Sequence, residues 1–237
     1  MKTYSEFYEE CKKDVMIKID QKLQKCAFLT KKNNFYFKKF NSFNEKYILL
    51  DEEPISLTNF DKKILEDKLF RVALAEPIRH NIGEKALEKL LFFSEKEKLI
   101  TNFQKFNSNT VRLDKLSGNM VFNKSKEKKF TKSIDFGLNS ISNFKKINLG
   151  DCIFSFQKNT TYKGGHQDNV LEETQIFTET AIKNRGKFLI LLDGEFWHGE
   201  SGKNIKEVKK LIPSSYKNII AGSANNLKEL LECLKNN

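Results

Sequence analysis

Residues 154–173 read FSFQKNTTYKGGHQDNVLEE, and this stretch decides how the chain folds. Apolar side chains alternate with other residues up to Lys158, which predicts a strand with a buried face. The two glycines that follow indicate a turn, and a helix is predicted from about residue 169 to 182. The apolar run FLILL at 188–192 is the strongest strand candidate in the chain. A helix that joins two strands of one sheet implies a parallel crossover.

Elsewhere the spacing of apolar residues alternates between helical and strand periods. Helices are expected at 3–29, 58–75, from Asn81 to about 106, 204–211 and 225–234. Strands are expected at 110–113, 120–122, 130–138, 151–158 and 218–221. The predicted fold class is α/β, with a mixed central sheet flanked by helices. We expect a mostly helical N-terminal region at 1–80 and an α/β core at 81–237.

Two segments have an unusual composition. Residues 35–50 read FYFKKFNSFNEKYILL, which predicts a pair of strands whose phenylalanines either stack on nucleic-acid bases or belong to the core. Residues 125–132 read SKEKKFTK, and this lysine-rich run predicts a mobile loop.

Composition limits the classes of function. The 42 Lys and Arg residues exceed the 31 Asp and Glu residues, and the net charge of +11 favours a polyanionic partner, unless an AT-rich genome accounts for the lysines. No apolar run is long enough to cross a bilayer, and the N-terminus lacks the apolar stretch of a signal peptide, so we expect a cytoplasmic protein without a membrane partner. The four cysteines have no zinc-ligand spacing, and the sequence contains no GxxxxGK[ST], GxGxxG or HExxH motif.

Four charged residues form a candidate site for phosphodiester hydrolysis. That reaction uses a hard cation held by carboxylates, and a lysine beside the cation can orient or activate the attacking water. Asp135 lies within an apolar strand pattern, and Lys158 ends the next predicted strand. Glu172 and Glu173 follow at the start of the crossover helix.

These residues and the order helix, three strands, helix, strand resemble the PD-(D/E)XK nuclease superfamily, and within it the type II restriction endonucleases. The family's metal-binding aspartate on the second core strand corresponds to Asp135, and its (D/E)-x-K element corresponds to Phe156-Gln157-Lys158. Ile134 stands where the family has proline, and Phe156 stands where it has the first acid. The resemblance covers roughly residues 80–194.

In one branch of this family the second acid lies on the following helix, about fourteen residues beyond the lysine, which points to Glu172. Family members also carry a Gly and a Glu on the first core helix, and Gly83 and Glu88 resemble that pair. The resemblance implies Mg²⁺ as cofactor, double-stranded DNA as substrate and, for a palindromic target, a homodimer.

The residues leave several alternatives open. Glu172 has the family spacing but also completes an N-x-x-E capping arrangement with Asn169, while Glu173 lies closer to the apolar side of the helix. Gln157 is the second ligand if the register shifts by one residue.

The turn before the crossover helix has two interpretations as well. Lys163, His166 and Gln167 either contact DNA or belong to an ordinary glycine turn. Asp135 is either a metal ligand or a solvent-facing acid at the edge of a strand.

The leading hypothesis is therefore a Mg²⁺-dependent type II restriction endonuclease that cuts double-stranded DNA at a short specific sequence. The alternatives are a nucleic-acid-binding protein without catalytic activity, and a DNA-repair nuclease with the same core.

Overall fold

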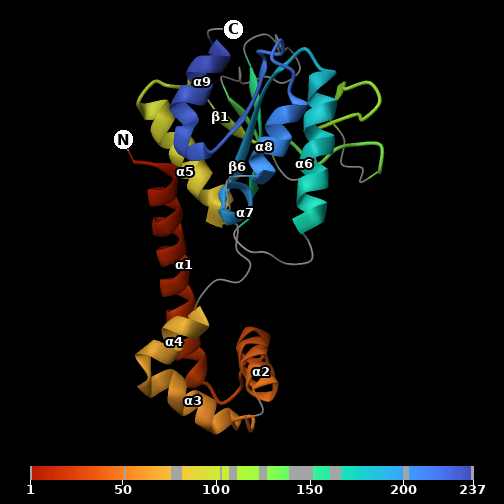
Figure 1. The fold of residues 1–237 in the computed structure, drawn as a ribbon. Helices are drawn as coiled ribbons and strands as arrows, with labels where there is room; N and C mark the ends of the chain where they lie inside the picture. The colour runs from red at the N-terminus through yellow and green to blue at the C-terminus, as the bar shows by residue number, and fades with distance from the viewer. Residues whose placement is uncertain are drawn as a thin grey trace. The chain divides into compact units, whose positions relative to one another are not determined.

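The computed structural model describes residues 2–50, 52–75, 82–101, 103–106, 111–122, 127–138, 152–160, 167–199 and 203–235. The chain divides into two compact units (Figure 1). The helical unit is Tyr8–Ile82, and the core unit is Met1–Phe7 together with Gly83–Asn237. The division falls close to the expected boundary at residue 80, except that the first seven residues belong to the core unit.

The core unit contains a five-stranded mixed sheet with the strand order β1-β4-β5-β6-β7. Its strands are β1 (Phe103–Lys105), β4 (Phe136–Leu138), β5 (Ile153–Asn159), β6 (Lys187–Asp193) and β7 (Ile219–Gly222). Strands β1, β4 and β5 pair antiparallel, and β5, β6 and β7 pair parallel. The predicted mixed sheet and parallel crossover are confirmed. A separate hairpin of β2 (Val111–Leu113) and β3 (Met120–Phe122) confirms the predicted turn between them.

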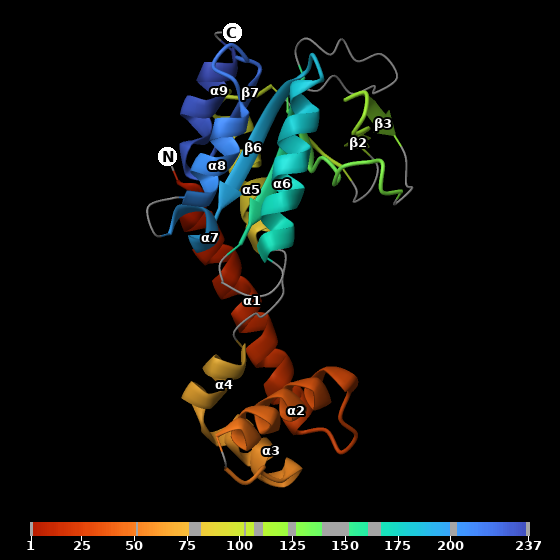
Figure 2. The same ribbon diagram turned by 45° about the vertical axis from the view of Figure 1, so that its right-hand side comes forward.

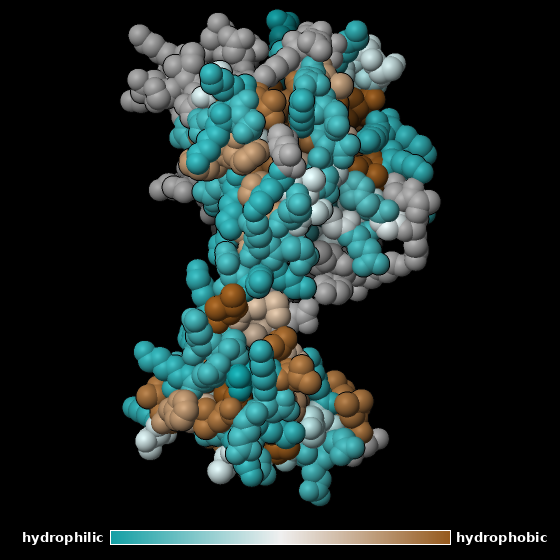
Figure 3. Space-filling model, turned by 90° about the vertical axis from the view of Figure 1, so that its left-hand side faces the viewer, coloured by the Kyte–Doolittle hydropathy of each residue, from teal (hydrophilic) through white to brown (hydrophobic). Residues whose placement is uncertain are grey.

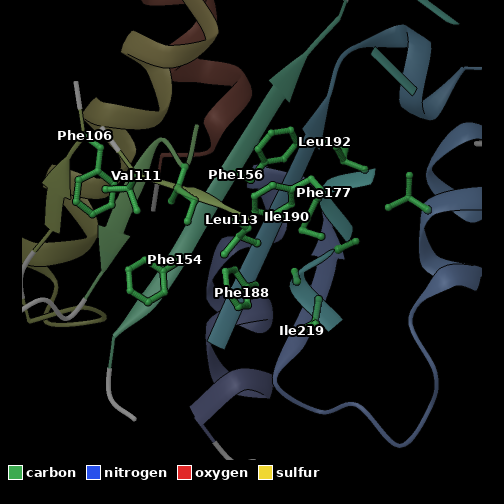
Figure 4. Close-up of a cluster of buried hydrophobic side chains, with 14 of the residues drawn as sticks. Phe106, Val111, Leu113, Phe154, Phe156, Phe177, Phe188, Ile190, Leu192 and Ile219 are labelled. Atoms are coloured by element: carbon green, nitrogen blue, oxygen red, sulfur yellow. The ribbon is translucent and has the colours of Figure 1, made fainter. Parts of the chain in front are cut away.

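The helices of the core unit cover both faces of this sheet (Figure 2). They are α5 (Ile82–Lys96), α6 (Gln167–Ile182), α7 (Glu195–His198), α8 (Lys203–Leu211) and α9 (Leu227–Lys235), with a short 3₁₀ turn at Ala224–Asn226 before α9. Because side chains alternate along a strand, Phe154 and Phe156 of β5 face the same side. Figure 4 shows these phenylalanines in a cluster with Phe177 of α6 and Phe188 of β6. The rings of Phe156 and Phe177 are stacked with centroids 4.3 Å apart, which holds α6 against β5.

Helix α5 packs against the opposite side of β5. Gln157, which points away from the Phe156 side, donates its side-chain N–H to the Gly83 carbonyl at 3.3 Å. A Cβ at Gly83 would lie 2.7 Å from Nδ2 of Asn159 and 2.9 Å from the Tyr4 hydroxyl. Glycine is therefore required at residue 83, because the start of α5 contacts the end of β5 directly.

The helical unit contains most of α1 (Tyr4–Ala27), with α2 (Asn34–Leu49), α3 (Leu57–Glu66) and α4 (Lys68–Ala75). The prediction of a strand pair at 35–50 is wrong, because this segment is helix α2. The Asn33 side chain caps α2 by accepting from the Tyr36 N–H at 3.0 Å. Rings of Phe40 and Phe43 pack against Phe60 of α3, so these aromatic residues build the core of the unit.

Two other helix predictions need correction. The single helix expected at 58–75 is interrupted at Asp67, whose extended backbone lets its carboxylate cap α4 through the Phe70 N–H at 3.0 Å. The helix expected to reach about residue 106 ends at Lys96, and strand β1 follows. Lys98 takes a left-handed conformation with φ 58°, which terminates the helix in the way that glycine usually does.

Apolar side chains also reach the surface of the helical unit, where they interrupt a largely hydrophilic exterior (Figure 3). Leu49, Leu50, Leu69 and Phe28 each expose more than two thirds of their surface.

Candidate active site at the end of strand β5

Asp135 lies immediately before β4, against the carboxyl-terminal half of β5. Its backbone N–H donates to Ser155 O at 2.9 Å, and its carboxylate Oδ2 accepts from the Gln157 N–H at 2.7 Å. Burial raises the pKa of this carboxyl from its ordinary 3.8 to about 6, although the Gln157 hydrogen bond and the charge of Lys158 both oppose the rise. A carboxylate that the fold holds at this cost is typical of a functional site.

Lys158 and Glu173 form an ion pair beside Asp135. Strand alternation points Lys158 to the same side as Phe156, where its Nζ lies 3.4 Å from Glu173 Oε2. The other oxygen of Glu173 lies 3.1 Å from Lys132 Nζ, so that one carboxylate bridges two ammonium groups. Glu172 is exposed, and the helical pitch turns it by about 100° from Glu173 around the axis of α6. The structure thus brings Glu173 to Lys158 and leaves Glu172 outside.

Gln157 lies on the other side of the strand, toward α5. Its side-chain amide lies 3.3 Å from both the Tyr4 hydroxyl and the Gly83 carbonyl. The neighbouring Asn159 donates to the Tyr4 hydroxyl at 2.6 Å. The Gln157 amide therefore joins α5 and the N-terminus to β5, while its backbone N–H is the group that contacts Asp135.

Helix α5 supplies a second charged cluster near Asp135. Lys105 of β1 pairs with Glu84 at 3.0 Å and with Glu88 at 3.2 Å. The negative charge of Glu84 raises the pKa of Asp135, and the positive charge of Lys105 lowers it. Glu88, the expected acid of the first helix, is thus tied to Lys105, and Glu84 is the α5 acid whose charge acts on Asp135.

Lys163 and His166 lie outside the described residues, as does Asn81. Gln167 begins α6, but its side chain is also outside the described part.

The carboxylate on the neighbouring strand serves the fold. Asp193 ends β6, and its Oδ1 accepts from the Ser223 hydroxyl at 2.7 Å and the Ala224 N–H at 3.1 Å. Burial raises its pKa to about 6. His198 contacts the Leu192 carbonyl through Nε2 at 2.7 Å. These contacts organise the turns after β6 and β7.

Of the two carboxylates in the site, Asp135 fits a hard cation better than Glu173 does. Among the described residues, the Asp135 carboxylate accepts one hydrogen bond, at Oδ2, which leaves Oδ1 available as an oxygen ligand. Both oxygens of Glu173 contact ammonium groups, so this carboxylate would have to exchange one of them for a metal. The described part of the chain contains no group of three or more His, Cys, Asp or Glu residues arranged to hold a metal ion.

Sequence reasoning missed Lys132, Glu84 and Lys105 as neighbours of the site. Both Lys105 and Glu84 lie within the helix that the sequence predicts from Asn81 to about residue 106. The polar run at 94–98 interrupts the apolar pattern of α5, but its residues are compatible with a continuing helix, so it does not by itself indicate that a strand follows.

Comparisons of the chain with models of protein families, with curated proteins and with solved structures give no match. None of the helices in the described residues combines the length and apolar composition that a membrane span requires.

Proposed function

We propose that this protein is a Mg²⁺-dependent endonuclease of the type II restriction kind, which hydrolyses phosphodiester bonds of double-stranded DNA. The observation that carries the proposal is the meeting of Asp135, Lys158 and Glu173 at the end of β5. Asp135 lies just before β4, Lys158 in β5 and Glu173 in α6. The helices and the strands of the central sheet follow in the order α5, β1, β4, β5, α6, β6, with the β2–β3 hairpin between β1 and β4. Apart from this hairpin, the order agrees with the one that the family resemblance implies. The net charge of +11 adds the affinity for a polyanion that such a substrate needs.

Each residue has a distinct role in this proposal. Asp135 and Glu173 would hold Mg²⁺, which when bound neutralises charge on the phosphate and lowers the pKa of a water molecule. The Gln157 N–H fixes the orientation of the Asp135 carboxylate through Oδ2. Lys158 donates to Glu173 and would orient the attacking water through another of its three N–H groups. A palindromic target would imply a symmetric homodimer.

The test is DNA cleavage with Mg²⁺ and with EDTA, using unmethylated phage DNA. The protein is compared with Asp135→Asn and Lys158→Met, which keep most of the side-chain volume while removing the charge. Glu172→Gln is the matched control, because it removes an exposed carboxylate from the same helix as Glu173. Discrete fragments that require Mg²⁺, vanish in the first two variants and persist in the control support the proposal. Intact DNA with every divalent metal tried, from folded protein, would refute it.

A nucleic-acid-binding protein without catalysis is the second candidate. Two observations favour it: the lack of a three-ligand metal cluster within the described residues, and the pairing of both Glu173 oxygens with lysines. It predicts salt-sensitive binding to DNA or RNA in EDTA, and intact nucleic acid in Mg²⁺.

A further inference from the structure

A pocket of about 550 Å³ lies beside the candidate active site, on the α6 side of the core unit. Its walls come from β2 and the residues after it, from the segment 127–132 and from α6. Figure 2 shows β2 next to α6. Glu173 lines this pocket and also contacts Lys158, so the pocket and the candidate site share a side chain.

Most of the charged residues that line the pocket are cationic. Arg112, Lys115, Lys128 and Lys132 line it, against two acids, Glu127 and Glu173. Both acids already contact lysines. Glu127 lies 2.9 Å from Lys129, and Glu173 bridges Lys132 and Lys158. The pocket therefore carries a surplus of positive charge, and an anion that entered it would meet groups able to neutralise it.

The backbone holds these cations in place. The Thr131 N–H donates to the Leu113 carbonyl at 2.9 Å, and the Lys115 N–H donates to the Lys129 carbonyl at 2.9 Å. Phe130 is buried. The part of the lysine-rich run that the structure describes, 127–132, is thus attached to the end of β2 by backbone hydrogen bonds. Arg112 is buried in the wall, which is unusual for a charged residue.

We infer that this pocket binds a phosphate group of the DNA backbone next to the one that is cleaved. The inference rests on the proposed function for the identity of the strand, since Glu173 connects the pocket to the candidate catalytic lysine. Phosphate is the fitting anion because lysines and an arginine that converge from separate elements are the groups that proteins use to contact it.

Lys132 couples the pocket to the candidate metal ligand. It lines the pocket and contacts Glu173 at 3.1 Å, so a phosphate in the pocket competes with Glu173 for this ammonium group. Phosphate binding would leave Glu173 with fewer cationic partners and thus more available to a metal ion. If Glu173 loses its charge, it no longer competes with the phosphate for Lys132. The phosphate should then bind Lys132 more tightly.

The experiment measures binding of a fluorescent 20-base-pair duplex in EDTA as a function of salt concentration, which requires no cleavage. The Lys115→Ala/Lys128→Ala variant removes two cations of the pocket. The Lys206→Ala/Lys210→Ala variant is the control, because it removes two exposed lysines from α8 and causes the same change in net charge. We expect the pocket variant to lower the magnitude of the slope of log K against log salt by about 1 to 2, and the control to lower it by less.

A second pair of variants tests the coupling. Glu173→Gln should bind the duplex more tightly in EDTA than Glu172→Gln does, although each substitution removes one negative charge from α6. Titration with a thymidine monophosphate distinguishes a strand from a free nucleotide. If thymidine monophosphate displaces the duplex only at concentrations high enough to act through ionic strength, the result supports a site for the DNA backbone. Saturable binding of thymidine monophosphate at micromolar concentration would overturn the inference in favour of a nucleotide site.

Failure of this inference is distinct from failure of the proposed function. If the protein cuts DNA but both lysine variants show the same salt slope, the pocket does not bind the backbone. If the pocket variant alone weakens binding while the wild-type protein leaves DNA intact, the pocket does bind the DNA backbone, but the nuclease proposal fails and with it the position of this phosphate next to a cleaved one.

Discussion

Replacing Asp135 by Asn should stabilise the core unit at neutral and alkaline pH while abolishing cleavage. The carboxyl is nearly isosteric with the amide, and the amide oxygen can still accept from the Gln157 N–H. What the substitution removes is the negative charge in a poorly solvated place. Functional carboxylates are often retained at the expense of stability in this way.

The magnitude follows from the pKa of Asp135, which burial raises from 3.8 to about 6. A shift of about two pKa units corresponds to roughly 3 kcal/mol of unfolding free energy. The side chain keeps some contact with solvent, so we expect about 1–2 kcal/mol. Because the folded pKa is raised, the folded state binds more protons than the unfolded state between about pH 4 and pH 6, and wild-type stability falls as pH rises through this window. The advantage of the variant should therefore be complete above pH 6 and absent below about pH 4.

The single tryptophan makes the assay specific to the core unit. Trp197 is fully buried in α7, and the helical unit contains no tryptophan. Urea unfolding followed by Trp197 fluorescence at pH 4 and pH 8 gives the two free energies. Asp193 titrates in the same window but is present in both proteins, so the difference isolates Asp135. A variant that is less stable than wild type at pH 8, or whose advantage persists at pH 4, would refute the reasoning.

Two substitutions test the packing of β5. Gly83→Ala should destabilise the core unit by about 1–3 kcal/mol, because the new Cβ would lie 2.7 Å from Asn159 Nδ2. Helix propensity alone predicts the reverse, so an increase in the urea midpoint would contradict the close contact. Ser155→Ala should leave the stability unchanged or raise it by up to about 1 kcal/mol, because Ser155 Oγ is buried without a hydrogen-bond partner among the described residues. If the variant loses more than about 1 kcal/mol of unfolding free energy in the same assay, the hydroxyl does form a hydrogen bond in the folded protein.

The α/β class and most elements of the core unit could be predicted from the sequence because local patterns determine them. The apolar run of β6 has few alternative structures. The end of α5 could not be predicted in the same way, since Lys98 adopts the left-handed conformation without the glycine that normally marks it. Because the helix is expected to continue to about residue 106, the sequence does not predict β1 or the place of Lys105 beside the site.

The error at 35–50 has a different cause. Aromatic residues at 36, 40, 43 and 47 have helical spacing, but their neighbours at 35 and 37 also suggest alternation. Whether this segment forms a helix or a strand depends on which other side chains its rings can pack against. Phe60 and Phe70, from two other helices, surround Phe43, and this tertiary contact is not visible in a local pattern.

The position of the second acid illustrates how side-chain direction limits what residue spacing can predict. Counting from Lys158 favours Glu172, whereas Glu173 lies four residues before Phe177 and therefore on the same face of α6. Stacking of Phe177 on Phe156 fixes that face against β5, and Lys158 lies two residues beyond Phe156 on the same side of the strand. Contact between Lys158 and Glu173 follows from these two periods together. By the same alternation the Gln157 side chain must point to α5, so it cannot serve the same cation as Lys158 unless the register of β5 changes.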